Sequence, residues 1–178
     1  ASVAIGVCLI SQGRLADGRA LVEQCIALHD PERHAAHAFL FGQDPLVAAL
    51  AYRAWALVVQ GDASEALAVV GEALRRADAV GHVFSRGLAL YFAAVVSDFR
   101  DDHAAVLQYA ERLVALADEH RFPFWQAGAV ALRGRALAAR GRHREGLDAM
   151  VAAREMSRAP SGGLGMTYFL RNVAEGYL

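Results

Sequence analysis

The histidines are the residues whose spacing first suggests chemistry. His34 and His37 lie three positions apart, so on a helix their side chains share one face. Three further potential metal ligands precede them, which are His29, Asp30 and Glu32. Zinc requires three or four ligands that are held rigidly, and no second spaced pair follows in the sequence. We therefore expect no metal and no cofactor, and interpret these histidines as solvated or as hydrogen-bonded between helices.

Hydroxyl and thiol side chains could instead serve a nucleophilic enzyme. None of the serines and cysteines considered lies in a GxSxG motif or beside a partner histidine, the contexts that activate such nucleophiles. These residues are Ser64, Ser85, Ser97, Cys8 and Cys25. The glycine-rich stretch 162–165 follows no predicted strand, so a long connection between helices explains it better than a phosphate-binding loop. We predict that the chain is not an enzyme.

The overall charge and the cysteines restrict the class of partner and the compartment. The net charge of −1 gives no general attraction to nucleic acid or to anionic lipid. Charged or polar residues interrupt every apolar run before it reaches the ~18 residues of a membrane span, and no signal peptide is recognisable. Cys8 and Cys25 lack CxxC spacing and fall on apolar helix positions, which predicts reduced core cysteines in a cytoplasmic protein, although neighbouring helices could bring them together.

Four short turns divide the chain into pairs of helices. Their central residues are Gly13, Gly61, Asp101 and Gly141, and each follows one apolar helical run and precedes another. The intervals between these positions are 48, 40 and 40 residues. Forty residues suffice for two helices of about four turns each and two short connections. The spacing therefore predicts a repeated helical hairpin.

Small side chains recur in step with these turns, at seven positions before and five positions after each turn residue. The two sets are Gly6, Ala54, Ala94 and Gly134, and Gly18, Ala66, Val106 and Gly146. Two helices approach closely only where their side chains are small. Apart from Val106, both sets consist of glycine and alanine, which is what a tight helical hairpin requires.

The same columns are those of the tetratricopeptide repeat, although the period exceeds its usual length. The sequence predicts an all-α fold, a right-handed α-α superhelix of about four helical hairpins and a partial fifth. The predicted repeats are 1–29, 45–80, 83–120, 124–158 and, in part, 165–178. The predicted helices are 2–12, 15–29, 45–60, 63–80, 83–99, 103–120, 124–140, 143–158 and 165–178, with a short additional helix between His34 and Phe41.

The first helix of each hairpin lines the concave face of such a superhelix, and aromatic and arginine side chains are frequent in these helices. This combination is typical of peptide-binding hot spots. The residues that we expect to be reachable there are Tyr52, Trp55, Arg86, Tyr91, Phe92, Phe99, Arg135, Tyr168 and Arg171. The alternative, that most of these side chains belong to the core, remains open. Phe84 and Phe124, 40 residues apart, would join the same row, either as packing between repeats or as part of a ligand ledge.

Several runs of residues resemble the C-terminal tetratricopeptide region of large bacterial signalling ATPases. These proteins join a P-loop ATPase to an adenylate cyclase-like domain or to a winged-helix DNA-binding domain. The resemblance covers roughly residues 29–147 and lies in His29-Asp30-Pro31, in the segments 37–45, 51–57 and 81–85, and in Phe122-Pro123-Phe124-Trp125. It implies a sensory or scaffolding role coupled to the ATPase. The chain contains no GxxxxGK[ST] motif and no cyclase-type pair of metal-binding carboxylates, so those activities would belong to other parts of the parent protein.

These expectations define two classes of function. The first is a non-catalytic interaction or sensor module, a segment of a larger protein that binds a peptide, another domain of its parent or a second copy of itself. The second is a small-molecule effector domain whose superhelix encloses a pocket. In either case we expect a cytoplasmic protein that contacts neither nucleic acid nor membrane.

Overall fold

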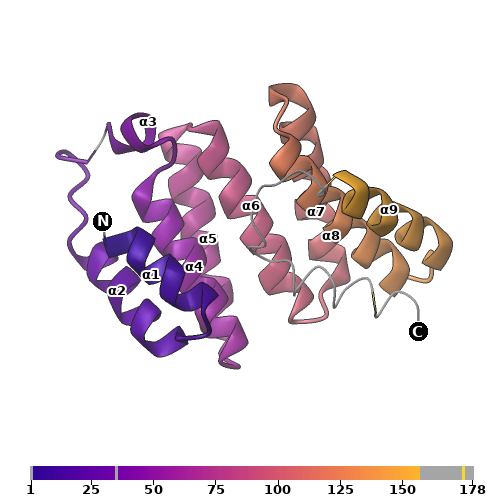
Figure 1. The fold of residues 1–178 in the computed structure, drawn as a ribbon, viewed down its shortest axis with the longest axis horizontal. Coiled ribbons are helices and arrows are strands. Elements are labelled where there is room, and N and C mark those ends of the chain that lie inside the picture. The colour runs from indigo at the N-terminus through magenta and orange to yellow at the C-terminus, as the bar shows by residue number, and fades with distance from the viewer. Residues whose placement is uncertain (1, 35, 157–173, 175–178) are drawn as a thin grey trace.

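The computed structural model describes residues 2–34, 36–156 and 174, and within them the chain forms nine α-helices and no strand (Figure 1). The predicted all-α fold is confirmed. The helices are α1 (Ser2–Ser11), α2 (Leu15–Ala27), α3 (His37–Phe41), α4 (Pro45–Val59), α5 (Ala63–Val80), α6 (Val83–Asp98), α7 (His103–His120), α8 (Pro123–Ala139) and α9 (His143–Met156). Their bounds lie within two residues of the predicted ones, except that the extra helix α3 is shorter. The predicted helix 165–178 falls outside the described residues.

The helices pair into antiparallel hairpins that stack in chain order. The hairpins are α1–α2, α4–α5, α6–α7 and α8–α9, and each packs against the next. The first helices α1, α4, α6 and α8 also contact one another in sequence, so they form one continuous face of the stack, which we call the first-helix face. In Figure 1 the tight turns within hairpins lie along the lower edge, and the connections between hairpins, including α3, lie along the upper edge.

Local sequence explains where the helices begin and end. The turns at Gly13, Gly61 and Gly141 have φ values of 81°, 93° and 86°, a left-handed conformation that glycine adopts without steric cost. Asp101 takes the corresponding position in the third turn at φ 56°. Aspartates cap the second helices α5 and α7: the Asp62 carboxylate accepts the Glu65 amide hydrogen bond at 3.1 Å, and Asp102 does the same for Ala105 at 3.0 Å.

The glycine pairs lie at helix crossings, as predicted. A Cβ atom added to Gly134 would lie 2.6 Å from the carbonyl oxygen of Gly146, and one added to Gly146 would lie 2.5 Å from the carbonyl oxygen of Gly134. The Gly6–Gly18 pair in the first hairpin is equally close, with 2.6 Å from the Gly18 Cβ position to the Gly6 oxygen. In these two hairpins the backbones touch directly, so no larger residue fits without moving a helix.

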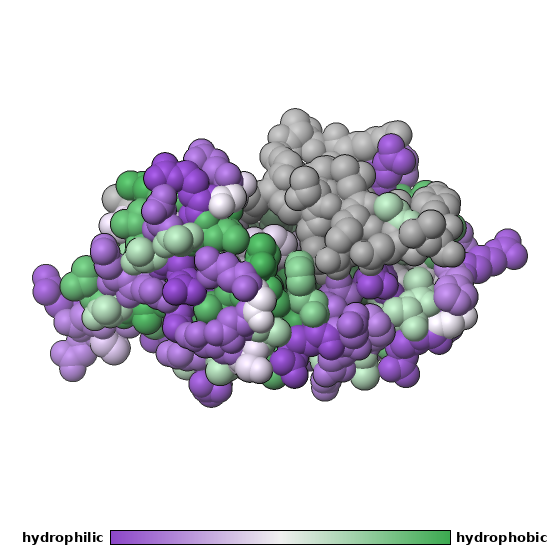
Figure 2. All heavy atoms as spheres, turned by 90° about the horizontal axis from the view of Figure 1, so that it is seen from below, coloured by the Kyte–Doolittle hydropathy of each residue, from purple (hydrophilic) through white to green (hydrophobic). Residues whose placement is uncertain are grey.

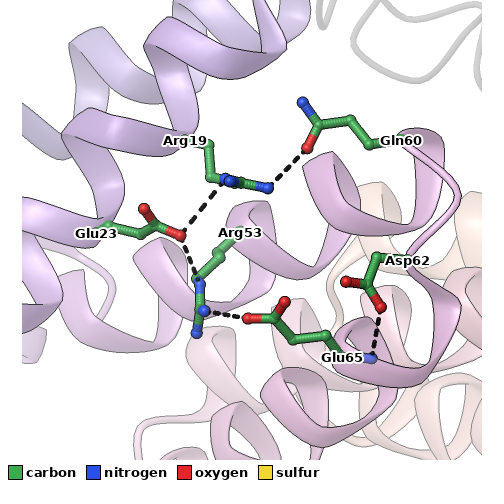
Figure 3. Close-up of polar contacts among 6 residues, drawn as sticks. All are labelled: Arg19, Glu23, Arg53, Gln60, Asp62 and Glu65. Atoms are coloured by element: carbon green, nitrogen blue, oxygen red, sulfur yellow. Dashed lines mark hydrogen bonds and ion pairs between the residues drawn. The ribbon is translucent and has the colours of Figure 1, made fainter.

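A polar network joins the first hairpin to the second (Figure 3). Arg53 of α4 contacts two carboxylates at once, with its Nε atom 3.0 Å from Glu23 of α2 and its Nη2 atom on Glu65 of α5. Arg19 of α2 lies 3.5 Å from Glu23 and donates a hydrogen bond to Gln60 at 2.9 Å. These contacts fix the register between the first two hairpins. They also leave Arg53 paired with two carboxylates.

The cysteine prediction needs correction for Cys8, which does not belong to the core, whereas Cys25 packs against the buried cluster that contains Ile10 and Val22. Cys8 is exposed, Cys25 is half-buried, and both are free. Helix α1 packs mainly against α2 and α4, which leaves the side of α1 that carries Cys8 open.

No helix in the described part of the chain is both long enough and apolar enough to cross a bilayer.

Candidate interaction surface

A continuous row of aromatic rings crosses the stack, and we call it the aromatic band. Seven of its rings form a chain of contacts from Phe99 to Phe122, and Tyr52 joins this chain at Phe92; the centroid separations lie between 4.9 and 6.1 Å, in the range of favourable aromatic pairs. The members are Phe99, Trp55, Tyr52, Phe92, Tyr91, Trp125, Phe84 and Phe122. Because α4, α6 and α8 all contribute rings, the band connects three hairpins.

The band has buried anchors and partly open edges. Phe92 and Trp125 are only 5% and 3% exposed, whereas Tyr52, Trp55 and Tyr91 are half-buried. The expectation that Phe92 is reachable is therefore wrong: its ring lies beneath Tyr52, Trp55 and Tyr91 and holds them in place. An arrangement of this kind presents preorganised aromatic edges with little side-chain freedom left to lose on binding.

Two glycines set the positions of the rings on α6 and α8. A Cβ atom at Gly87 would lie 2.7 Å from Nε1 of Trp125, and one at Gly128 would lie 3.0 Å from Cε2 of Tyr91. The indole therefore packs directly on the backbone of α6, and the Tyr91 ring on the backbone of α8. Sequence reasoning missed both glycines because they lie outside the columns that step with the turns.

The two tyrosine hydroxyls of the band stay protonated over a wide pH range. Burial raises the pKa of Tyr52 to about 12, with a smaller contribution from the neighbouring Cys8 thiol. Burial likewise raises the pKa of Tyr91 to about 12, and the proximity of Tyr52 adds to this effect. Near neutral pH both groups are uncharged hydroxyls that can donate as well as accept hydrogen bonds.

The predicted arginines take part in ion pairs. Arg86 on α6 lies 3.2 Å from Asp78 of α5, and both side chains are well exposed. Arg135 on α8 lies 3.4 Å from the carboxylate of Asp98, which is buried. The structure thus brings Tyr52, Trp55, Tyr91, Phe92 and Phe99 together in one band, with the two arginines on its α6 and α8 helices. The predicted residues Tyr168 and Arg171 lie outside the described part of the chain.

The band ends at an apolar groove along the edge that carries the inter-hairpin connections. This hollow of about 420 Å³ is lined by Phe39, Gly42, Gly81, His82, Val83, Phe84 and Phe122. Beside it, Phe39, Leu40 and Phe41 of α3 are 72%, 70% and 65% exposed. Figure 2 looks onto the opposite edge, where hydrophilic and hydrophobic side chains are interspersed over the described residues. The apolar run Phe39-Leu40-Phe41 is a sequence signal that could have indicated this groove, but the exposure of these side chains cannot be read from periodicity.

Ser85, one of the serines considered as a nucleophile, has a structural role. Ser85 is fully buried; its Oγ atom accepts the Asp44 amide hydrogen bond at 2.8 Å and lies 3.1 Å from Nδ1 of His82. This serine joins the start of α4 to the start of α6 and has no access to a substrate. Within the residues that the structure describes, no three histidine, cysteine or acidic side chains are grouped so that they could hold a metal ion.

Comparisons with known proteins leave the family open. No protein-family model matches the chain, and none of the curated proteins compared with it is significantly similar.

Proposed function

We propose that this chain is a non-catalytic interaction or sensor module that binds a peptide or a partner domain along the aromatic band. The observation that carries this proposal is the continuity of the band: eight rings from successive hairpins contact one another, and several of them keep an open edge. Tyr52, Trp55 and Tyr91 are half-buried, so part of each ring stays accessible to a ligand.

The chemistry of the band suits a protein ligand. Aromatic side chains offer a large contact area and few rotatable bonds, so they bind at low entropic cost, and tryptophan, tyrosine and arginine dominate binding hot spots. The hydroxyls of Tyr52 and Tyr91 can hydrogen-bond a peptide backbone while the ring faces receive apolar side chains. An extended or helical peptide with one or two apolar anchors is the ligand that this surface fits best.

The resemblance to signalling ATPases suggests what binding would achieve. In that setting, occupancy of the band would shift the parent protein between two states of its ATPase or output domain. Such a shift requires that the ligand bind one state more tightly than the other. The cytoplasmic location and the link to an adenylate cyclase-like or DNA-binding output belong to the same proposal.

A peptide-display selection against the purified chain tests this function. Both tryptophans of the chain belong to the band, so intrinsic fluorescence reports directly on its occupancy. We expect selected peptides to change the tryptophan emission, and Tyr52→Leu and Tyr91→Leu to weaken their binding about tenfold, corresponding to ~1.4 kcal/mol. Both variants keep the two tryptophan reporters.

Leu67→Ser provides the matched control. Leu67 is 40% exposed on α5, a second helix, and belongs to no part of the band. Its replacement should leave the affinity of the selected peptides unchanged. Peptides that bind without changing the emission, or whose binding ignores both tyrosine variants, would show that the binding surface lies elsewhere.

A further inference from the structure

The aromatic band continues into the apolar groove on the edge that carries the inter-hairpin connections. Phe84 and Phe122 belong to both surfaces, because their rings contact each other edge-on at 6.1 Å and both line the hollow of about 420 Å³. Phe39 and Val83 add further apolar walls. A ligand that follows the band toward this edge therefore meets the groove as its next contact surface.

Two stretches of backbone without side chains complete the lining of the groove. Gly42 follows α3 and Gly81 follows α5, and both line the hollow. A Cβ atom added to either glycine would meet no atom within 4 Å, so the space in front of both residues is open. The groove therefore combines apolar walls with bare backbone that a ligand can approach closely.

One polar side chain on the groove has its proton placed by its neighbours. Nδ1 of His82 accepts the Ser85 amide at 3.4 Å and lies 3.1 Å from the Ser85 hydroxyl. The oxygen of that hydroxyl already accepts the Asp44 amide, so its hydrogen is left to donate to Nδ1. These bonds assign the imidazole proton to Nε2, for which the described residues provide no acceptor. The groove lining thus includes one N–H donor.

The groove and the tyrosine edges of the band lie along one face of α6. Phe84 and Tyr91 are seven residues apart on this helix, which is two turns or about 10 Å along its axis. The indole of Trp125 contacts both rings, at 5.0 Å and 5.9 Å, and packs on Gly87 between them. Aromatic surface therefore connects the groove to Tyr91 without a break.

We propose that the groove is the anchor pocket of the peptide site and takes one large apolar side chain of the ligand that lies on the band. This inference rests on the proposed function and adds the chemistry of the ligand to it. Continuity with the band assigns the groove to the same ligand. The donors along the path, which are the His82 N–H and the hydroxyls of Tyr52 and Tyr91, suit the backbone carbonyls of a peptide beside its apolar anchor.

The spacing along α6 determines where the ligand should carry its two main contacts. A distance of about 10 Å corresponds to about three residues of an extended peptide, or about seven residues of a helical one. Binding energy concentrates in a few buried contacts. We therefore expect one hot spot at the apolar anchor and a second one, at one of these two spacings, at the residue that contacts Tyr91.

Alanine scanning of the tightest-binding display-selected peptide tests the spacing. The affinity of each peptide variant is measured through the tryptophan emission of the chain. We expect two positions to weaken binding about tenfold or more, one of them a large apolar residue, about three or about seven positions apart. A single such position, or two positions at another spacing, would contradict the anchor pocket.

Phe39→Ser and Leu40→Ser provide a matched pair of variants. The two residues are neighbours on α3 and are 72% and 70% exposed, but of the two only Phe39 lines the groove. We expect Phe39→Ser to weaken the peptide about tenfold and Leu40→Ser to leave its affinity unchanged. Replacing the peptide anchor by alanine should abolish the difference between the unmodified chain and Phe39→Ser, because the interaction is then already lost.

The outcomes separate this inference from the proposed function. If Tyr52→Leu and Tyr91→Leu weaken the peptide while Phe39→Ser and Leu40→Ser act alike, the band binds the ligand and the groove does not take its anchor. If none of the four variants changes the affinity, the ligand binds away from the band, and both proposals fail.

Two further measurements keep the result with Phe39 specific. Phe39→Leu retains an apolar wall and should recover part of the affinity, and an affinity no better than that of Phe39→Ser would show that the wall is not the cause. Light scattering of the free chain tests the competing occupant. A dimer that Phe39→Ser dissociates would show that a second copy of the chain, and no peptide anchor, fills the groove.

Discussion

At the scale of single residues, glycines, which have no side chain, matter to the packing of this molecule as much as the side chains that it buries. Gly134 and Gly146 allow α8 and α9 to touch backbone to backbone, whereas Gly71 on α5 faces open space apart from the flexible end of Arg75 at 3.6 Å. All three glycines lie within helices, where glycine is intrinsically unfavourable. Gly134 and Gly146 offset this cost at a close approach of two helices, whereas Gly71 serves no such approach.

Gly134→Ala should therefore destabilise the chain although alanine is the better helix former. The new methyl group would lie 2.6 Å from a backbone oxygen, so α8 and α9 must separate, at a net cost of about 2 kcal/mol. Urea unfolding followed by circular dichroism measures this change.

Gly71→Ala is the matched control at a helix position without crowding. It should stabilise the chain by up to about 1 kcal/mol through helix propensity alone. Similar effects of the two substitutions would mean that the α8–α9 crossing is not as close as described.

At the scale of elements, the helices α4, α5, α6 and α7 each begin at a side chain that accepts a backbone amide hydrogen bond. Asp62 performs this task at the exposed start of α5, while Asp44 performs it at the start of α4 in the interior. Asp44 also contacts Arg76, and its own amide donates to Ser85. One carboxylate therefore ties the start of α4 to α5 and, through its backbone, to α6.

Replacing the two caps should separate these roles. Asp62→Ala removes one exposed cap and should cost about 1 kcal/mol. Asp44→Ala also leaves the Arg76 guanidinium without its buried partner and should cost about 3 kcal/mol. Thermal and urea unfolding of both variants provide the comparison.

A second-site change distinguishes the charge from the cap. In Asp44→Ala/Arg76→Met the uncompensated charge is gone, so part of the lost stability should return. If the double variant is as unstable as Asp44→Ala, the Asp44–Arg76 pair contributes nothing beyond the cap.

At the scale of the whole molecule, the described hairpins form a linear stack in which each contacts its neighbours. Stability in such a stack is roughly a sum of hairpin terms and interface terms. The first two hairpins are joined by the Arg53 network in addition to their apolar contact (Figure 3). A change at this interface should affect local opening of the first hairpin before it affects the rest.

Arg53→Met should lower the free energy of opening of α1 and α2 by up to about 1 kcal/mol, because the pairs with Glu23 and Glu65 are only partly shielded from water. Arg14→Met is the matched control, since Arg14 pairs with Asp17 inside one hairpin. Native-state hydrogen exchange at low denaturant measures both. A uniform loss of protection in all hairpins after Arg53→Met would contradict the linear-stack description.

The parts of this structure that depend on local sterics could be predicted from the sequence. The turn residues at positions 13, 61, 101 and 141 and the glycines seven positions before or five after them determine the hairpins, because only small or left-handed residues satisfy those positions. The aromatic band was partly predicted, because the sequence places most of its rings on the first helices of the hairpins. The burial of Phe92 was not, because it depends on rings from α4 that pack above it.

Features that join distant segments escaped prediction. The exposure of Cys8 depends on which helices pack against α1, and periodicity within α1 does not reveal that. The contact of His82 with Phe39 joins residues 43 positions apart (82 and 39), so no local pattern signals it. Of the three histidines at positions 29, 34 and 37, His34 accepts a local hydrogen bond from the Asp30 amide, and Nε2 of His29 has no hydrogen-bond partner among the described residues, so the expected bonds between helices are not seen there.

The most direct test of the proposed function is chemical-shift mapping of a display-selected peptide on the isotopically labelled chain. Our account predicts that the perturbed amides cluster along α4, α6 and α8 beside Tyr52, Trp55 and Tyr91. Perturbations confined to the second helices α2, α5, α7 and α9 would contradict it.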